Sequence, residues 1–403
     1  MFLRKTPYSV LLLFLSLTLG LYPKSALAET LRYKVSARMW VPEAVEPVPT
    51  PDSALQRIER VFELWTSVPK APMEFKFVGL SAEHYTLPHE IPRDGILRIV
   101  LDSDYLFEAP AAHRSRCFGQ SPDHYEGGYV FLNVREGLEA LSFPVLAHEI
   151  GHALGIVGHS PAPAALMNAE GPTWKHWDVR ALTEQDQALW VDAWKPEALY
   201  RISGRVETGQ DQRVPVHAVH VVNGRTYSTR CDAGGAFEIL VMRPGRYRLF
   251  AKGYESGTLG EPVSQSPSWY MSPGKSTNDP YLGTPIHLSS STRRIEGVLL
   301  AMIDEAPPFS FWETEVEDIS AAFLRGGRSA AMKLLYSDGK IRSVEPYGLN
   351  PDYTVRAFDP VLNEITVMAK RDADPGHRLF IARGAKGMVQ AGLLGVHLVE
   401  EPK

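Results

Sequence analysis

Three histidines recur at fixed spacing within twelve residues of this chain, in the segment HEIGHALGIVGH at 148–159. The pattern is H-E-x-x-H-x-x-G-x-x-H. His148 and His152 are four residues apart and therefore share one face if the segment is helical. Gly155 can adopt the left-handed conformation that ends a helix, which would turn the chain and bring His159 to the same point. The spacing thus predicts three imidazole ligands for one tetrahedral metal ion.

Glu149 follows the first of these ligands and is predicted to lie beside the open fourth position of the metal. A zinc ion held by three histidines lowers the pKa of its bound water toward about 7, and a neighbouring carboxylate can take the proton. The motif therefore predicts one catalytic Zn²⁺ with Glu149 as the general base of a hydrolysis. Chance is a poor explanation, because five fixed positions should arise on the order of 10⁻⁴ times in a chain of this length.

Two further residues narrow the class of zinc hydrolase that the pattern predicts. Ser160 directly follows the last histidine, and Met167 lies eight residues beyond His159 in the segment ALMN. With these additions the sequence resembles the matrixin branch of the metzincin zinc proteases, in which a Met-turn follows the histidine motif. The resemblance implies that Met167 forms an apolar floor below the metal. It also implies a zinc metalloendopeptidase with a polypeptide as its substrate.

The strand before the metal helix has a role in that family, where it is the sheet edge that pairs with an extended substrate. The matching segment here is residues 127–133. The resemblance therefore implies that a substrate pairs with the backbone of Gly128, Tyr129, Val130 and Phe131. A plain edge strand without this role is the alternative interpretation.

Three features of the family are missing. No propeptide fits between the predicted cleavage site of the signal peptide and the first predicted helix, and the PRCGxPD cysteine switch does not occur. The histidine-and-aspartate pattern of the family's structural zinc is also missing from the polar loop predicted at 102–126. A Ca²⁺ ion or a second Zn²⁺ ion is therefore unproven, and the sequence does not show how latency would be controlled.

The N-terminus has the three parts of a signal peptide. Arg4 and Lys5 are basic, and residues 10–21 are mostly apolar. Ala26 and Ala28 then form an A-x-A cleavage site. An apolar run of about 12 residues is too short to cross a bilayer as a helix. We therefore expect cleavage after Ala28, a secreted or periplasmic protein, and no transmembrane anchor.

Charge and cysteine content bear on the class of partner. The formal net charge is −5, and removal of residues 1–28 takes away three basic residues and no acidic ones, which gives −5 − 3 = −8. An acidic protein of this kind is a poor match for nucleic acid. Cys117 and Cys231 are its two cysteines, and we expect both to be unpaired thiols because they fall in different predicted domains.

The predicted fold class is α+β. Residues 29–199 are expected to form a metzincin-like catalytic domain, with a twisted, mostly parallel sheet and three helices. The first helix begins at Asp52, the second carries two of the metal ligands, and the third begins with the capping box at 183–186, TEQD. Two all-β sandwich domains are expected to follow.

Beyond Pro196 the character of the sequence changes, and short strands alternate with glycine turns. Residues 200–304, with GRV, VHAVHVV, DAGGAF and RPGRYRL, resemble the carboxypeptidase regulatory-like, transthyretin-like β-sandwich. Residues 305–403, with RGGRSA and ADPGHRLFI, resemble immunoglobulin-like β domains. Neither segment holds a predicted catalytic cluster, so these domains could bind a surface, a polymer or the protease domain.

Two functions stand as hypotheses. The main one is an exported zinc-dependent endopeptidase that hydrolyses peptide bonds with a zinc-activated water and Glu149 as the base. The alternative is an exported adhesion or carbohydrate-binding protein whose zinc domain is structural or vestigial. A hydrolase of non-peptide amides is a narrower alternative that the motif does not exclude.

Overall fold

The structure of this protein is a computed structural model. It describes residues 29–41, 45–69, 73–102, 113–121, 124–132, 142–162, 165–168, 182–206, 215–252, 269–271, 286–302, 309–312, 323–325, 329–333, 341–362, 364–374, 376–384 and 389–397. The predicted signal peptide at 1–28 lies outside these ranges.

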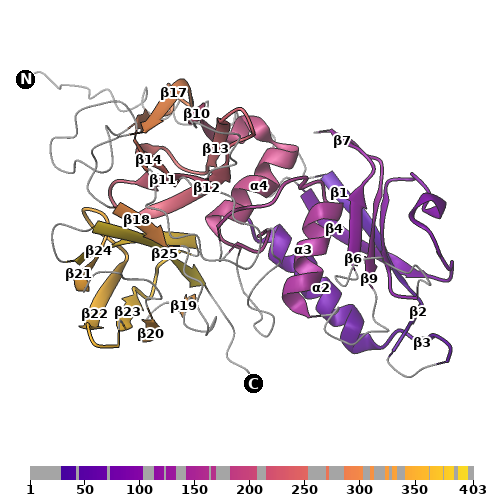
Figure 1. Cartoon of the computed structure of the whole chain (residues 1–403). Helices are drawn as coiled ribbons and strands as arrows, with labels where there is room; N and C mark the ends of the chain where they lie inside the picture. Colours follow the sequence, from indigo (N-terminus) through magenta and orange to yellow (C-terminus); the bar gives the residue numbers. More distant parts are fainter. Residues whose placement is uncertain are drawn as a thin grey trace, which may run out of the picture.

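A five-stranded sheet organises the N-terminal part of the chain (Figure 1). Its strands are β1 (Glu29–Ser36), β4 (Met73–Ser81), β5 (Ile96–Val100), β6 (His113–Cys117) and β9 (Gly128–Leu132). In the order β4-β1-β5-β9-β6, the first four strands are parallel and β6 runs antiparallel to β9. Alternation of apolar residues builds β1, because Leu31, Tyr33 and Val35 are all buried in the main core.

Three α-helices are described, and they pack against the sheet and one another (Figure 1). They are α2 (Asp52–Thr66), α3 (Phe143–Ala153) and α4 (Glu184–Trp194). The predicted helix at Asp52 is confirmed, and the Phe62 ring stacks on Tyr33 with centroids 3.9 Å apart. Trp190 of α4 meets Trp65 of α2 at 5.6 Å. Among the residues that the structure describes, no helix is long and apolar enough to cross a membrane.

Short elements connect these strands and helices. β2 (Arg38–Met39) pairs with β3 (Val48–Pro49), and β7 (Gln120–Ser121) pairs with β8 (His124–Tyr125). Single 3-10 turns occur at Pro88–Glu90 and Pro196–Ala198.

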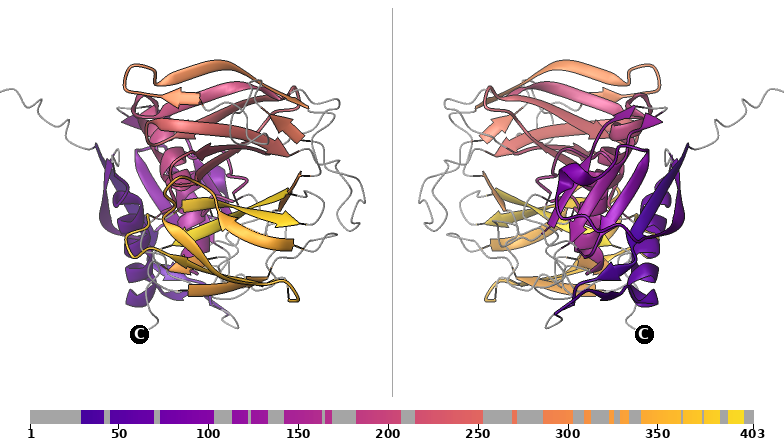
Figure 2. Two further views of the ribbon diagram at one scale, coloured as in Figure 1. Left: turned by 90° about the vertical axis from the view of Figure 1, so that its left-hand side faces the viewer. Right: turned by 90° about the vertical axis from the view of Figure 1, so that its right-hand side faces the viewer.

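The described residues of the C-terminal part from Tyr200 form strands. These strands lie beside the N-terminal part in Figure 1, in front of it in the left view of Figure 2 and behind it in the right view. They are β10 (Tyr200–Val206), β11 (Pro215–His220), β12 (Arg225–Arg230), β13 (Ala236–Val241), β14 (Gly245–Lys252), β15 (Trp269–Met271), β16 (Ile286–Leu288), β17 (Arg294–Met302), β18 (Phe309–Trp312), β19 (Phe323–Arg325), β20 (Ser329–Lys333), β21 (Ile341–Pro346), β22 (Tyr353–Asp359), β23 (Glu364–Ala369), β24 (Gly376–Gly384) and β25 (Val389–His397). A 13-stranded sheet has the main path β13-β10-β17-β15-β14-β11-β12-β24-β25-β18, and β20, β23 and β22 form a separate three-stranded sheet.

This architecture corrects the predicted fold class. With 25 strands and three α-helices among the described residues, the chain is mostly β rather than α+β. The prediction of two separate sandwiches also fails. Strand β12 belongs to residues 200–304 and β24 to residues 305–403, which we together call the tail, and their antiparallel pairing joins both segments in one sheet. Glycine turns in a sequence show where strands begin and end, but not which distant strands pair. Strands that are adjacent in sequence are the usual neighbours in a sheet, so a pairing between distant strands was not expected. The domain boundaries remain predictions.

Helix α4 contacts the tail through buried polar groups. Glu184 at its start accepts hydrogen bonds from Arg225 and Tyr227 of β12, at 2.5 and 2.7 Å. The Gln185 side chain accepts a third from the Ser228 amide at 2.7 Å. Because buried charges are costly unless they are paired, these contacts fix α4 against the tail sheet.

Candidate metal centre

Helix α3 presents two of the three histidines of the motif. Pro144 lies in its first turn, where the missing amide hydrogen has no helical partner to lose. Ser142 is the N-cap residue, but its side chain makes no capping hydrogen bond. The helix is buried on most sides, and the Trp65 indole donates to the Ala147 carbonyl at 3.2 Å. Packing rather than capping therefore holds this helix in place.

The imidazoles of His148, His152 and His159 converge on one point. His152 Nε2 lies 3.2 Å from His148 Nε2 and 3.1 Å from His159 Nε2. Nitrogens at about 2.0–2.1 Å from one tetrahedral zinc ion lie roughly 3.3–3.4 Å apart, so the spacing fits a single ion. Among the described residues, these three form the one cluster of His, Cys, Asp or Glu side chains whose ligand atoms lie within reach of a common metal.

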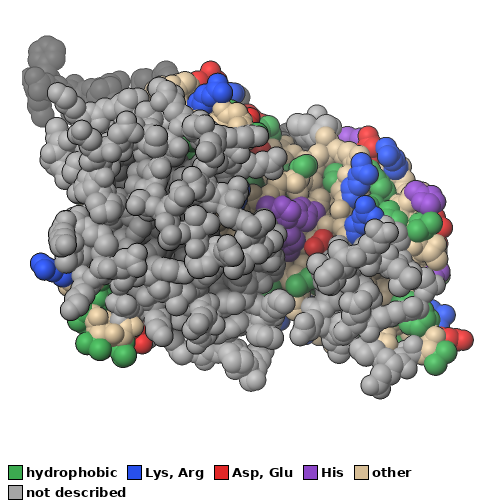
Figure 3. All heavy atoms as spheres, viewed as in Figure 1, with side chains coloured by type: hydrophobic (Ala, Val, Ile, Leu, Met, Phe, Trp, Pro, Cys, Tyr) green, Lys and Arg blue, Asp and Glu red, His purple; other side chains and the backbone are tan. Residues whose placement is uncertain are grey.

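The three rings lie at increasing exposure. His148 is 6% exposed, His152 is half-buried and His159 is exposed. Figure 3 shows histidine side chains gathered at the surface near the middle of the molecule, beside an acidic group. A metal ion could therefore reach the cluster from solvent while one ligand remains anchored in the core.

Main-chain carbonyls hold the far nitrogens of two rings. His148 Nδ1 lies 2.7 Å from the Leu166 carbonyl oxygen, and His152 Nδ1 lies 2.7 Å from that of Ile156. A carbonyl can only accept, so each Nδ1 carries the hydrogen and each Nε2 keeps its lone pair. Burial lowers the pKa of His148 to about 4 and also lowers that of His159. His148 and His159 are thus neutral at pH 7, and the neutral imidazole is the form that binds metal.

Gly155 lies directly after the C-cap residue of α3, with a φ of +105°. A Cβ atom at this position would lie 1.5 Å from Gln120 Oε1. The Gln120 amide is itself held, because its Nε2 donates to the Ala193 carbonyl at 2.9 Å. Both the backbone conformation and the close side chain therefore require glycine, and the resulting turn carries the chain to His159.

Glu149 lies next to the first ligand, and its charge reaches two rings of the cluster. Burial is the main cause of the lowered pKa values of His148 and His159, and the Glu149 carboxylate opposes that shift in both. Glu149 Oε2 accepts a hydrogen bond from Ser115 Oγ of β6 at 2.5 Å. A lone serine in a polar segment carries no sequence signal, so Ser115 was not predicted.

Met167 is fully buried and packs against α3 close to the histidines. Its Sδ lies 2.7 Å from the point where a Cβ of Gly151 would stand, and the Trp65 ring lies 2.8 Å from the same point. Gly151 therefore lets Met167 approach the helix. The Met167 carbonyl accepts a hydrogen bond from the Ser160 amide at 2.6 Å, which closes the loop that follows His159.

Asp186 of α4 holds the same loop from the other side. Its carboxylate accepts hydrogen bonds from the amides of Leu166 and Met167, at 3.0 and 2.9 Å. It belongs to the predicted capping box, which is confirmed at Thr183, whose hydroxyl accepts from the Asp186 amide. The capping pattern predicts a helix start but not this second contact, so the role of Asp186 at the centre was missed.

The predicted substrate edge is an interior strand. Gly128, Tyr129, Val130 and Phe131 lie in β9, which pairs with β5 on one side and β6 on the other, and all four residues are buried. The edge strand is β6, with the sequence HRSRC. It lacks the alternating apolar residues that identify a strand, and the sequence predicts a loop there.

Cys117 and Cys231 form no disulfide with each other, as expected from the sequence. Burial raises the pKa of Cys117 to about 11, and its Sγ lies 3.6 Å from Gln120 Oε1. Because a metal binds the thiolate rather than the thiol, Cys117 is a poor ligand at neutral pH.

Comparisons with known proteins give no family. No family model matches the chain, and no curated protein matches it. The chain is similar to the mixed-linkage glucan utilization locus protein SGBP-B of Bacteroides ovatus, solved with a mixed-linkage heptasaccharide, at 14% identity over 50% of this chain with a TM-score of 0.16. The match spans 40% of that protein. It is also similar to a candidate adhesin from Bacteroides ovatus, at 13% identity over 51% of this chain and 87% of the other, with a TM-score of 0.17.

These findings correct the assignment to the matrixins. No family model places the chain among the metzincins, and the described fold is mostly β. The predictions of a metzincin-like fold, a zinc metalloendopeptidase and a polypeptide substrate are therefore corrected. They rest on a motif confined to residues 148–167, and a short motif does not carry the family or the activity of a whole chain.

Proposed function

We propose that this chain is an exported zinc-binding protein that acts in adhesion or carbohydrate binding. Residues 29–199 would form the zinc domain, and residues 200–304 and 305–403 the β domains. The observation that carries the proposal is the convergence of three Nε2 atoms, with His152 at 3.2 and 3.1 Å from the other two. Imidazole nitrogens suit Zn²⁺, whereas Ca²⁺ and Mg²⁺ prefer oxygen ligands.

The surroundings of the cluster support a resident ion. The Nδ1 hydrogen bonds of His148 and His152 direct both lone pairs inward, and such contacts strengthen metal ligands. Glu149 adds a negative charge beside the rings, which favours a cation. The ligands come from α3 and from the turn after Gly155, so bound zinc would tie the helix end to that turn. This is the structural role proposed for the metal.

The tail is proposed as the binding part. Its turns carry exposed apolar side chains, with Leu349 at 80%, Val361 at 87% and Leu362 at 56% exposure. Apolar groups on turns can contact a surface or the apolar face of a sugar. Export is supported by the predicted signal peptide with cleavage after Ala28.

Metal binding and surface binding can be tested on the same preparation. Metal-free protein from residue 29 onward is titrated with Zn²⁺ against a chromophoric chelator, and its retention on immobilised mixed-linkage glucan is then measured. We expect one zinc ion per chain and retention on the glucan. His152→Ala should weaken zinc binding at least 100-fold, whereas His124→Ala, at an exposed histidine outside the cluster, should leave it unchanged.

Two results would contradict the proposal. Equal zinc affinity in the wild type and in His152→Ala would show that the histidine cluster is not the zinc site. Zinc-dependent cleavage of unfolded casein, abolished by Glu149→Ala and by a chelator, would show that the protein is a peptidase rather than a binding protein.

A further inference from the structure

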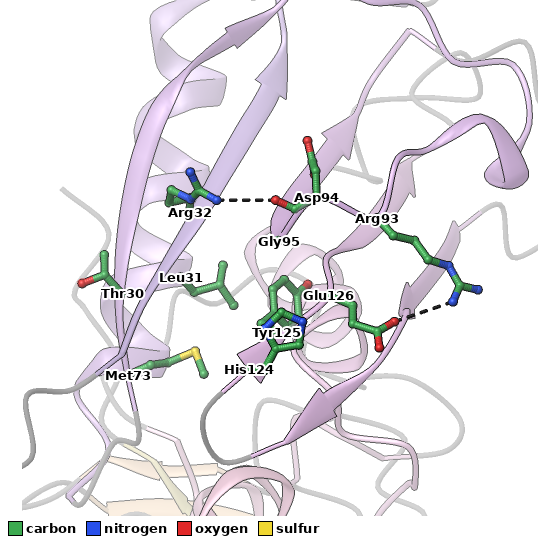
Figure 4. A pocket seen from close by; sticks show the side chains of 10 residues that line it. All are labelled: Thr30, Leu31, Arg32, Met73, Arg93, Asp94, Gly95, His124, Tyr125 and Glu126. Carbon is green, nitrogen blue, oxygen red and sulfur yellow. Dashed lines mark hydrogen bonds and ion pairs between the residues drawn. The ribbon is translucent and has the colours of Figure 1, made fainter.

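A second site lies away from the histidine cluster, at the amino ends of three parallel strands. A pocket of about 560 Å³ is bordered there by the starts of β1 and β4, by the residues that lead into β5 and by β8 (Figure 4). Its volume lies in the range of small-molecule sites, roughly 300–1,000 Å³. None of its ten lining residues belongs to the histidine cluster.

The floor of this pocket is apolar and rigid. Leu31, Met73 and Tyr125 are 3%, 1% and 5% exposed, so these side chains are fixed by the core below them. The Tyr125 hydroxyl donates to the Ala153 carbonyl at 2.9 Å, and its ring lies 5.9 Å from that of Trp194. A ligand would therefore meet a preformed apolar surface, which lowers the entropic cost of binding.

The acidic groups at the pocket are already paired. Both carboxylate oxygens of Asp94 accept hydrogen bonds from Arg98, at 2.7 and 2.8 Å. Figure 4 shows the Asp94 carboxylate directed away from the apolar floor. Glu126 pairs with Arg93 at 3.6 Å, and that guanidinium also lies over the Phe118 ring at 5.3 Å. Neither carboxylate therefore neutralises the remaining charge in the pocket.

That remaining charge is the guanidinium of Arg32. Its Nη2 donates a long hydrogen bond of 3.4 Å to the Asp94 carbonyl oxygen, which carries no formal charge. An arginine has five N–H donors, and its planar fork matches a carboxylate with two parallel hydrogen bonds. Arg32 thus presents a positive fork at the same pocket that Leu31, Met73 and Tyr125 line.

We propose that this pocket binds a small organic carboxylate, with the acid group on Arg32 and the apolar body over Leu31, Met73 and Tyr125. The ligand would be a molecule that combines one anionic group with a flat or compact apolar part. The site is independent of the zinc centre, and its ligand would bind with or without the metal.

The probe is 4-fluorobenzoate, observed by ¹⁹F NMR with the full chain from residue 29, kept metal-free by a chelator. We expect saturable line broadening for 4-fluorobenzoate and none for 4-fluorobenzamide, which has the same shape without the charge. Arg32→Met should weaken binding at least tenfold, because it removes both the positive charge and the N–H donors that would hold the carboxylate. Arg32→Lys should fall between the two, since lysine keeps the charge but loses the fork.

Arg230→Met is the matched control, because Arg230 is exposed at the end of β12, outside the pocket lining. It should bind the probe as the wild type does. Wild-type binding in Arg32→Met with an unchanged circular dichroism spectrum would overturn the proposal. Equal binding of the benzamide, or binding of the benzoate that appears only after zinc is added, would do the same.

Discussion

The Asp186 carboxylate accepts a hydrogen bond from the Met167 backbone amide at 2.9 Å. Its second oxygen accepts one from the Leu166 amide at 3.0 Å, and the Leu166 carbonyl in turn accepts from Nδ1 of His148 at 2.7 Å. A buried carboxylate on α4 thus sets the peptide unit that orients a proposed metal ligand. Helix α4 is part of the centre although it supplies no ligand.

Replacing Asp186 should weaken zinc binding without touching a ligand. Asp186→Asn keeps the shape of the side chain, but its amide cannot accept both backbone hydrogen bonds. We expect zinc affinity to fall about 10- to 100-fold, as for other groups that orient metal ligands, in a titration against a competing chelator. Asp192→Asn on the same helix, which removes the ion pair with Arg201, should retain wild-type affinity. Wild-type zinc affinity in Asp186→Asn would show that Asp186 does not orient His148 through the Leu166 peptide group.

The turn after α3 should tolerate a methyl group at one glycine and not at another. Gly155→Ala places a Cβ 1.5 Å from Gln120 Oε1 at a φ of +105°, and the backbone strain alone is about 1–2 kcal/mol. We expect a loss of about 2 kcal/mol or more in urea unfolding. Gly158→Ala, where nothing lies within 4 Å, should change stability by less than about 0.5 kcal/mol. Equal effects of the two substitutions would be inconsistent with this turn.

The contact between α4 and the tail should depend on Glu184. Its side chain is 7% exposed and pairs with Arg225, whose own side chain is 11% exposed. Glu184→Ala leaves that guanidinium with Asp374 at 2.5 Å and Asp352 at 3.7 Å. Breaking a buried pair costs about 3–5 kcal/mol. We expect a loss near the lower end of that range in urea unfolding. Glu197→Ala, at an exposed site just after α4, is the control. A loss below about 1 kcal/mol for Glu184→Ala would show that the contact does not hold the two parts together.

Acid should remove the contribution of the Asp94–Arg98 pair. Hydrogen bonds from the Arg98 guanidinium lower the pKa of the Asp94 carboxyl, below the value of about 3.9 in an unfolded chain. The ionised form therefore stabilises the fold above that pH, and the contribution is lost as pH falls through the folded value. Asp94→Asn should lower the melting temperature at pH 6 and have little effect near pH 2. An equal loss at both pH values would mean that ionisation of Asp94 is not the cause.

Local patterns in the sequence predicted local structure well. The apolar spacing after Asp52 and the capping box at Thr183 each correspond to a helix that the structure contains. Both signals come from residues within a few positions of one another. Apolar side chains recur on one helix face, and capping side chains gather at one helix end, so a short stretch of sequence contains the whole pattern.

Long-range contacts were beyond the reach of the sequence. The edge strand β6 has no apolar alternation, and the pairing of Arg225 with Arg378 joins strands far apart in the chain. Ser115 hydrogen-bonds to Glu149 across 34 residues of sequence, and Asp186 hydrogen-bonds to Met167 across 19 residues. Only the fold brings these residues to the histidine cluster. A single-sequence pattern holds no information on such pairs.

The coordination sphere of bound zinc tests the central claim most directly. X-ray absorption at the zinc edge of the loaded protein should show three imidazole nitrogens at about 2.0–2.1 Å, supplied by His148, His152 and His159. The same spectrum should show no sulfur near 2.3 Å, since the thiol of Cys117 stays protonated. An all-oxygen shell, a sulfur contribution, or a protein that retains no zinc would contradict the proposed metal centre.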